Sequence, residues 1–271
     1  MRVAVDGVYF GTNVGRLPDD VIKLAAGVGA DGLNWPLHPH YHADPARFAK
    51  KIADFGLAVV SLGLMPHISA VPGSEFDFRE LVKRALDAAH IFGAPVLDLW
   101  TWHPPDVDKA AAQTTLAHNI EAVAPMVADA GCVLSFEFEP DTTLERYDEA
   151  LTFLAPFGPT VRITADTYHI FRVGDDLLAA AMALGPRIGI IHFSGSHRGE
   201  PCSEGSGGPE GSPDHCEYEP FLRAAVKAGY AGDVVLQYKP PVDAEGRPDE
   251  EETAASLKRA VAFARTTIAS L

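Results

Sequence analysis

Short apolar segments alternate with longer helix-like segments from one end of the chain to the other. The apolar segments are mostly rich in Val, Ile, Leu or Phe, which is typical of strands buried on both faces. Because strands that alternate with helices form a parallel sheet, this pattern constrains the fold more than any other feature. The predicted strands are Val3–Tyr9, Gly32–Trp35, Ala58–Leu64, Val96–Trp100, Val133–Phe138, Arg162–Ala165, Ile188–Phe193 and Val234–Tyr238.

Helices are predicted in the intervals between the strands, at Asp20–Val28, Pro45–Phe55, Phe76–Phe92, Val107–Ala130, Thr143–Leu154, Asp175–Leu184, Glu217–Ala228 and Glu251–Ile268. Asp44 is a suitable N-cap for the second of these helices, because Pro45 then occupies the first turn. Glycines stand where C-terminal caps are expected, at Gly56, Gly93, Gly131, Gly185 and Gly229.

The chain has 271 residues, of which 47% are hydrophobic, and this is enough for one large core. Eight strands and eight helices in strict alternation predict a single α/β domain over residues 1–271, folded as a closed (β/α)8 TIM barrel. A doubly wound sheet is the alternative. It is disfavoured because no Gly-x-Gly-x-x-Gly turn follows the first strand.

Composition argues against several classes of partner. The formal net charge of −15 disfavours a nucleic-acid-binding surface, which needs clustered Lys and Arg. The sequence has no apolar run of about 18 residues, so no membrane span is expected. Three widely spaced cysteines without a CxxC motif, and no recognisable secretory signal, fit a reduced, cytoplasmic setting.

Residues able to bind a metal ion stand at the ends of four consecutive predicted strands. They are Glu137, Asp166, His192 and Gln237. In a (β/α)8 barrel the carboxyl ends of the strands converge on one mouth, so these side chains are expected to meet. Two carboxylates, one imidazole and one amide oxygen form a mostly hard ligand set. We therefore expect one divalent metal ion, with Mn²⁺, Mg²⁺ or Co²⁺ favoured and Zn²⁺ also compatible.

Aromatic and imidazole side chains follow other strand ends. Trp35, His67, Trp102 and His103 are candidate substrate-binding residues, because aromatic faces suit the C–H surface of a sugar and imidazoles suit its hydroxyls. Packing at the barrel rim is the alternative. The expected partner is a small-molecule sugar or polyol.

A long loop at residues 195–216 contains six glycines and three prolines and follows the seventh predicted strand. It is interpreted either as a lid over the site or as a surface insertion.

These motifs together resemble the xylose isomerase-like TIM barrels, a group of sugar phosphate isomerases and epimerases. The group includes ketose 3-epimerases, hydroxypyruvate isomerases and inosose dehydratases. The Phe-Glu-Phe segment at 136–138 resembles the first metal strand of the family. Asp166-x-x-His169 resembles the second, and His192 followed by Arg198 resembles the third. The Gly229-Tyr230-x-Gly232 segment that leads into Gln237 resembles the last strand.

The resemblance implies roles for these residues. Asp166 and its three partners would hold the metal, His169 would lie near the substrate, and Arg198 would bind a substrate oxygen. Glu137 would remove the proton next to a metal-chelated carbonyl. The family also leads us to expect a homo-oligomer, either a dimer or a tetramer.

The sequence departs from the family pattern at Gln237, where the last strand usually ends in Glu. An amide offers an oxygen to a metal but cannot accept a proton at neutral pH. Epimerisation by two carboxylates on two faces of the substrate is therefore expected to be impaired. Candidates to return the proton are Glu139, His169, His103 and Lys239.

An isomerase or epimerase of a sugar-like keto substrate is the leading interpretation. A lyase resembling inosose dehydratase, using one base, is the second. A catalytically silent sugar-binding barrel is the third. An endonuclease of the same wider family would need a basic groove, which the net charge of −15 argues against.

Overall fold

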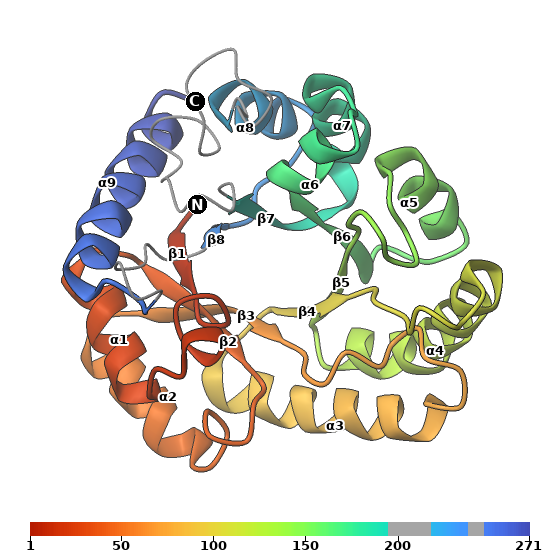
Figure 1. Ribbon diagram of the computed structural model, residues 1–271, viewed down its shortest axis with the longest axis horizontal. Helices are drawn as coiled ribbons and strands as arrows, with labels where there is room; N and C mark the ends of the chain where they lie inside the picture. Colours follow the sequence, from red (N-terminus) through yellow and green to blue (C-terminus); the bar gives the residue numbers. More distant parts are fainter. Residues whose placement is uncertain (195–217, 238–246) are drawn as a thin grey trace.

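The computed structural model describes residues 1–194, 218–237 and 247–271. Its strands form a closed parallel barrel in sequence order, with β1 paired to both β2 and β8 (Figure 1). The (β/α)8 barrel predicted from the alternation is confirmed. The strands are β1 (Val3–Asp6), β2 (Gly32–Pro36), β3 (Ala58–Gly63), β4 (Val96–Trp100), β5 (Val133–Glu137), β6 (Val161–Asp166), β7 (Ile188–Ser194) and β8 (Val234–Gln237).

Within the described residues, strand bounds agree with the predicted ranges to within one residue, except at β1. Tyr238, the predicted end of the last strand, lies outside the described residues. Strand β1 ends at Asp6, three residues earlier than the predicted Tyr9. Its early end has a local cause, because Asp6 Oδ1 accepts hydrogen bonds from the backbone N–H groups of Val8 (2.6 Å) and Tyr9 (2.7 Å). These bonds turn the chain away from the sheet direction directly after Asp6.

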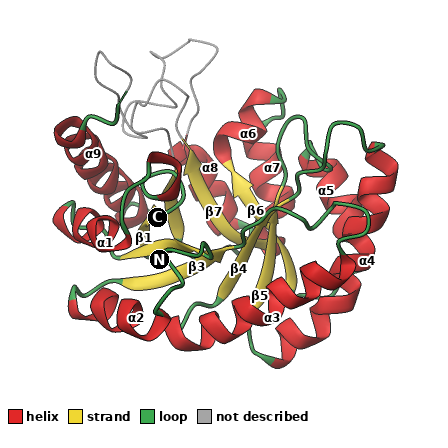
Figure 2. Cartoon of the chain, turned by 60° about the horizontal axis from the view of Figure 1, so that its bottom comes forward, coloured by secondary structure: helices red, strands yellow, loops and turns green. Residues whose placement is uncertain are grey.

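The helices surround the barrel (Figures 1 and 2). Within the described residues they are α1 (Pro18–Gly27), α2 (Pro45–Asp54), α3 (Glu75–Phe92), α4 (Lys109–Asp129), α5 (Tyr147–Leu154), α6 (Thr167–Arg172), α7 (Leu177–Leu184), α8 (Tyr218–Lys227) and α9 (Glu250–Ala269). None of these helices is both long enough and apolar enough to cross a membrane.

Helix caps follow the sequence signals closely. Asp44 accepts a hydrogen bond from the backbone N–H of Arg47 (3.0 Å), as expected of an N-cap. The glycines after α2, α3, α4 and α8 all have positive φ angles. Gly185 differs, because its φ of −38° keeps it right-handed, and the chain continues into a short 3-10 turn, Gly185–Arg187.

The short helix α6 was not predicted. It begins directly after β6, where Asp166 is its N-cap and accepts a hydrogen bond from the backbone N–H of His169 (2.8 Å). The sequence gives little sign of a helix here, because six residues are too few to show a helical period. This helix holds His169 at the barrel mouth, next to Asp166.

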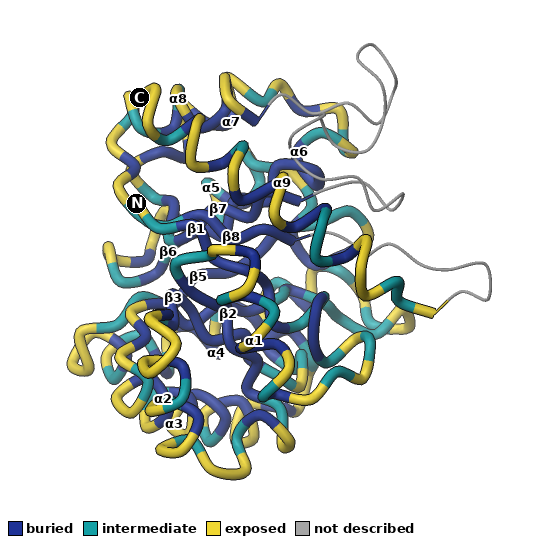
Figure 3. The backbone as a smooth tube through the Cα atoms, turned by 90° about the vertical axis from the view of Figure 1, so that its left-hand side faces the viewer, coloured by how far each residue is buried: buried dark blue, intermediate teal, exposed yellow. Residues whose placement is uncertain are grey.

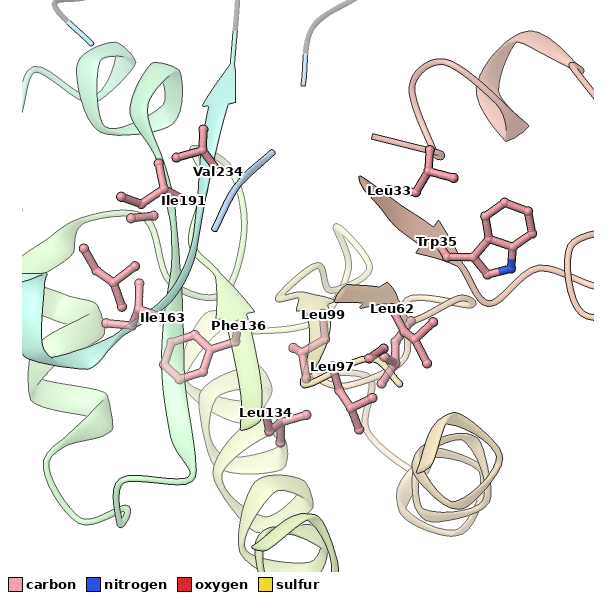
Figure 4. Packing of buried hydrophobic residues seen from close by; sticks show 14 of the residues in the cluster. Leu33, Trp35, Leu62, Leu97, Leu99, Leu134, Phe136, Ile163, Ile191 and Val234 are labelled. Atoms are coloured by element: carbon pink, nitrogen blue, oxygen red, sulfur yellow. The ribbon is translucent and has the colours of Figure 1, made fainter. Parts of the chain in front are cut away.

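Two apolar layers build the core. The larger one lies between strands and helices, and Figure 4 shows part of it, including Leu33, Trp35, Leu97 and Phe136. Exposed residues lie on the outer helices and loops, while the residues of the central strands are mostly buried (Figure 3).

A second, smaller cluster joins residues of six different strands and must therefore lie inside the barrel: Ala4, Val60, Val96, Ile190 and Val235, with Val133 packed against it. Toward the carboxyl ends of the strands the inward positions become polar. Asp6, Asn34, Asp98, Ser135, Thr164 and His192 are all buried there. A polar barrel interior at the carboxyl ends of the strands is where enzymes of this architecture keep their sites.

Candidate metal centre

A cavity of about 300 Å³ lies at the carboxyl ends of the strands. It is lined by residues of β1 to β5, β7 and β8, by segments that follow them, and by His169 of α6. Its titratable and amide-bearing lining residues include Asp6, Asn34, Asp98, Glu137, Glu139, His169, His192 and Gln237. Residues far apart in the sequence therefore meet at one mouth of the barrel.

Glu137, Asp166 and His169 form the tightest group of metal-ligating side chains in the described residues. One ligand atom from each lies within 4.8 Å of the others, and all three residues are buried. A divalent ion binds donors at about 2.0–2.6 Å, so atoms on opposite sides of it are separated by about twice that distance. These three side chains are therefore close enough to share one ion.

His192 also contacts Glu137. Its Nδ1 is 3.0 Å from Glu137 Oε1, and its Nε2 is 3.3 Å from Asp98 Oδ2. Of the two histidines, His169 falls in the tightest group although the sequence placed it near the substrate. His192, predicted as a ligand, contacts that group through Glu137.

Asp166 is only 1% exposed and is held firmly. Ser194 Oγ lies 2.5 Å from each carboxylate oxygen of Asp166. Asp166 Oδ1 also accepts the hydrogen bond that caps α6. Asp166 Oδ2 lies 3.7 Å from His169 Nε2. Neighbouring strands thus orient this carboxylate before any ion binds.

Several buried polar atoms that belong to lining residues have no hydrogen-bond partner within the described part of the chain. They include Asn34 Oδ1, His67 Nδ1, His169 Nδ1 and Gln237 Oε1. A buried polar group without a partner is costly, so such a cluster indicates a site that a polar ligand or an ion completes. The donor set of two carboxylates, imidazoles and an amide oxygen fits a divalent cation.

A hydrogen-bonded chain fixes the wall next to Glu137. Thr164 Oγ1 donates to Asp98 Oδ1 (2.5 Å), and Ser135 Oγ lies 2.8 Å from Thr164 Oγ1. Asp98 Oδ2 in turn contacts His192. Such contacts from an outer carboxylate orient a ligating imidazole.

The electrostatics of the cavity reflect burial and crowding of like charges. Burial raises the pKa of Glu137 to about 7. Burial would lower the pKa of His192, but Asp98 and Glu137 raise it well above its usual value. Burial, together with Glu137 and Asp166, also raises the pKa of the Tyr9 hydroxyl.

Metal uptake should therefore depend on pH. A divalent ion must displace a proton from Glu137 or His192, whose pKa values are raised in the metal-free protein. Affinity for Mn²⁺ is expected to fall by tenfold or more for each pH unit below about 7, because one or two protons then compete for the ligands. Calorimetric titration of chelator-treated protein at several pH values measures this. An affinity that does not change over this range would contradict the assignment of these ligands.

The predicted substrate-binding residues divide into two groups. His67 and Glu139 line the cavity, and the His67 ring lies edge-on to Trp100 with 5.0 Å between centroids. Trp102 and His103 are not among its lining residues. His103 Nδ1 lies 3.0 Å from Thr143 Oγ1, and Trp102 packs at 6.4 Å from Trp100. Tyr9 and Trp100 are the aromatic residues that reach the cavity.

Trp35 requires a correction. It is fully buried in the cluster between the barrel and its helices (Figure 4). There it packs against Tyr41, Phe48 and Phe92. Its Nε1 donates to the backbone oxygen of Tyr41 (3.1 Å). Side chains alternate along a strand, so Asn34 faces the cavity and Trp35 faces away.

Arg198, Lys239 and the predicted lid at 195–216 lie outside the described residues.

The lining residues that the sequence reasoning missed include three polar ones at the barrel mouth, Asp6, Asn34 and Asp98. The alternation of side chains between the two faces of a strand could have identified the two acids as inward-facing. Asp6 ends the run Val3-Ala4-Val5, and Asp98 lies between two leucines in β4. A lone acid inside an otherwise apolar strand faces the side opposite its apolar neighbours.

Comparison with known proteins gives a consistent result. The sequence profile of a family described as "Xylose isomerase-like TIM barrel" matches residues 22–263. A human protein named "Putative hydroxypyruvate isomerase" is 23% identical over 263 residues, covering 86% of this chain and 90% of the relative.

Solved structures share the fold. A D-psicose 3-epimerase in the presence of D-fructose superposes with a TM-score of 0.81 at 18% identity, covering 99% of both chains. The IOLI protein with a bound zinc atom superposes with a TM-score of 0.71 at 14% identity, covering 100% of this chain and 97% of the other.

Proposed function

Because the chain belongs to the xylose isomerase-like TIM barrel family, we propose that it is a divalent-metal-dependent isomerase or epimerase of a neutral, sugar-like keto substrate. The observation that carries this proposal is the grouping of Glu137, Asp166 and His169 at a cavity that also contains His192 and Gln237. The names of the human relative and of the epimerase structure support the same reaction class.

The proposed ligands are Glu137, Asp166, His192 and Gln237, which are the residues that the family motifs match. When bound, the ion would act as a Lewis acid toward a substrate carbonyl and its adjacent hydroxyl. His169 Nε2 lies 3.6 Å from Glu139 Oε1 and 3.7 Å from Asp166 Oδ2. His169 and Glu139 are proposed to hydrogen-bond the substrate hydroxyls that reach this side of the cavity.

Glu137 is the proposed base. Its carboxylate is buried, lines the cavity and is oriented by the contact with His192 Nδ1. A base held in one position can take the proton from the carbon next to the carbonyl without first reorganising. The electron pair of that C–H bond moves toward the carbonyl oxygen and leaves an enediolate.

Charge in the cavity favours a neutral substrate. Its described lining residues include the carboxyl groups of Asp6, Asp98, Glu137 and Glu139, and no Lys or Arg. A carboxylate or phosphate group on the substrate would be repelled by this set. A ketose has only hydroxyls and a carbonyl, while Tyr9 and Trp100 offer aromatic faces to its C–H surface.

Deuterium exchange tests this function. Protein loaded with Mn²⁺ is incubated in D₂O with D-fructose, D-tagatose, L-ribulose, hydroxypyruvate and an inosose, and the products are followed by NMR. We expect deuterium at the carbon next to the carbonyl, and a new isomer or epimer, for at least one neutral ketose. No exchange with any compound would contradict the proposal.

The alternatives give different spectra. A lyase would convert the inosose with loss of water, and a silent sugar-binding barrel would exchange no deuterium. We also propose, from the family, a dimer or tetramer, and light scattering on the purified protein would measure this oligomeric state. A cytoplasmic location is proposed from the cysteine usage.

A further inference from the structure

We propose that Asp6, at the end of β1, is the second acid–base residue of the site and faces the substrate from the wall opposite Glu137. This inference rests on the proposed function and deepens it. The proton-accepting group that Gln237 cannot provide would stand on the neighbouring strand. The reaction would then be an inversion at carbon.

The register places Asp6 beside Gln237. In the β1–β8 pairing Ala4 lies opposite Val235 and Val5 lies opposite Leu236, so Asp6 and Gln237 are the next residues of each strand. Ala4 and Val235 both belong to the apolar cluster inside the barrel. Side chains alternate, so the residues two positions later also point inward. Both Asp6 and Gln237 line the cavity.

The barrel order places Asp6 across from Glu137. In a closed barrel of eight strands, β1 and β5 are separated by four strand steps in either direction (Figure 1). Asp98 is a less suitable candidate because β4 is paired with β5, so it shares the Glu137 wall. Its carboxylate is also engaged by Thr164 and His192.

Asp6 is a fixed carboxyl group that accepts hydrogen bonds from neutral donors. Asp6 is 1% exposed, its Oδ1 accepts from two backbone N–H groups, and its Oδ2 accepts from Asn34 Nδ2 at 2.9 Å. No Lys or Arg of the described residues forms a salt bridge with it. A buried acid that serves only the fold is usually paired.

With these two groups, the proton taken from carbon is balanced by a proton returned to it. Glu137 takes the proton from one face of the carbon, and the C–H electron pair forms the enediolate. The Asp6 carboxyl then gives its proton to the opposite face of that carbon, and the electron pair returns to form the new C–H bond as the carbonyl is restored. Exchange with solvent resets both groups.

The Asp6→Asn variant tests the role directly. The new amide oxygen can still accept hydrogen bonds from the backbone N–H groups of Val8 and Tyr9. The Asn34 side chain can turn so that its Oδ1, which has no partner in the described residues, accepts from the new amide. The fold and the metal content should therefore be retained. Using the ketose that wild-type protein epimerises in D₂O, we expect inversion to fall about 100-fold or more, while exchange by Glu137 remains within a few-fold.

Gln237→Glu tests whether a new carboxylate can rescue Asp6→Asn, and it also gives a second, independent test. Combined with Asp6→Asn, it returns a carboxylate to the same wall and should restore inversion at least about tenfold over the single variant. A rise of about 100-fold on Gln237→Glu alone would overturn the proposal whatever the behaviour of Asp6→Asn.

The remaining outcomes separate this inference from the proposed function. Inversion at the wild-type rate in Asp6→Asn would overturn the role of Asp6 alone. Equal loss of exchange and inversion, without rescue by Gln237→Glu, would show that Asp6 only supports the fold. Wild-type protein that exchanges no deuterium with any ketose would overturn both. Thermal unfolding and metal content are measured for every variant.

Discussion

Glu137→Gln is expected to reduce turnover by about a thousandfold, because it removes both the proposed base and one charge of the metal centre. Gln has nearly the same shape as Glu, and its amide oxygen can still accept a hydrogen bond from His192 Nδ1, which lies 3.0 Å from Glu137 Oε1. The backbone oxygen of Glu137, which accepts from Thr101 Oγ1, is unchanged. The fold should therefore survive.

The measurement is the rate of deuterium exchange in D₂O, together with thermal unfolding. Glu121→Gln is the matched control, because Glu121 is an exposed residue of α4 far from the cavity lining. It should exchange at the wild-type rate. Full exchange by Glu137→Gln would remove this residue from the mechanism.

Asp166→Asn is expected to lower metal affinity by more than about 100-fold, which exceeds the usual effect of losing an outer hydrogen-bond partner of a ligand. The variant removes a negative charge from the group formed with Glu137 and His169. Asn remains a good N-cap, so α6 should still begin at residue 167. Calorimetric titration with Mn²⁺ measures the loss.

Asp176→Asn is the control for this variant. Asp176 is also an N-cap, accepting from the backbone N–H groups of Leu178 and Ala179, but it is exposed at the start of α7. Its substitution makes the same chemical change at a helix start without touching the cavity. If both variants bound Mn²⁺ as tightly as wild type, Asp166 would not be a ligand.

The barrel was predictable because its strands and helices differ so clearly in composition. Strands such as Val96–Trp100 are bounded by glycine, proline and polar segments, and their buried apolar runs leave little choice of register. α6 was missed because it has only six residues. Its start depends on the Asp166 cap, which the sequence shows only as an acid at the end of a strand.

The sequence predicted site residues that stand at strand ends. It did not predict roles that depend on which side of the sheet a side chain faces. Glu137 and Gln237 both reach the cavity. Trp35 also stands near a strand end, but alternation turns it into the outer core. Asp6 and Asp98 follow from the same alternation, yet their proximity to Gln237 and His192 depends on barrel closure and stagger, which no local pattern encodes.

The metal content of the purified protein, measured by mass spectrometry of the elements, is the most direct test of a shared cation at Glu137, Asp166, His192 and Gln237. Roughly one divalent ion per chain is expected in wild-type protein, and much less in Asp166→Asn. Chelator treatment should remove the ion and the deuterium exchange together, and Mn²⁺ should restore both. Wild-type protein that is free of metal and still exchanges at its full rate would contradict the account.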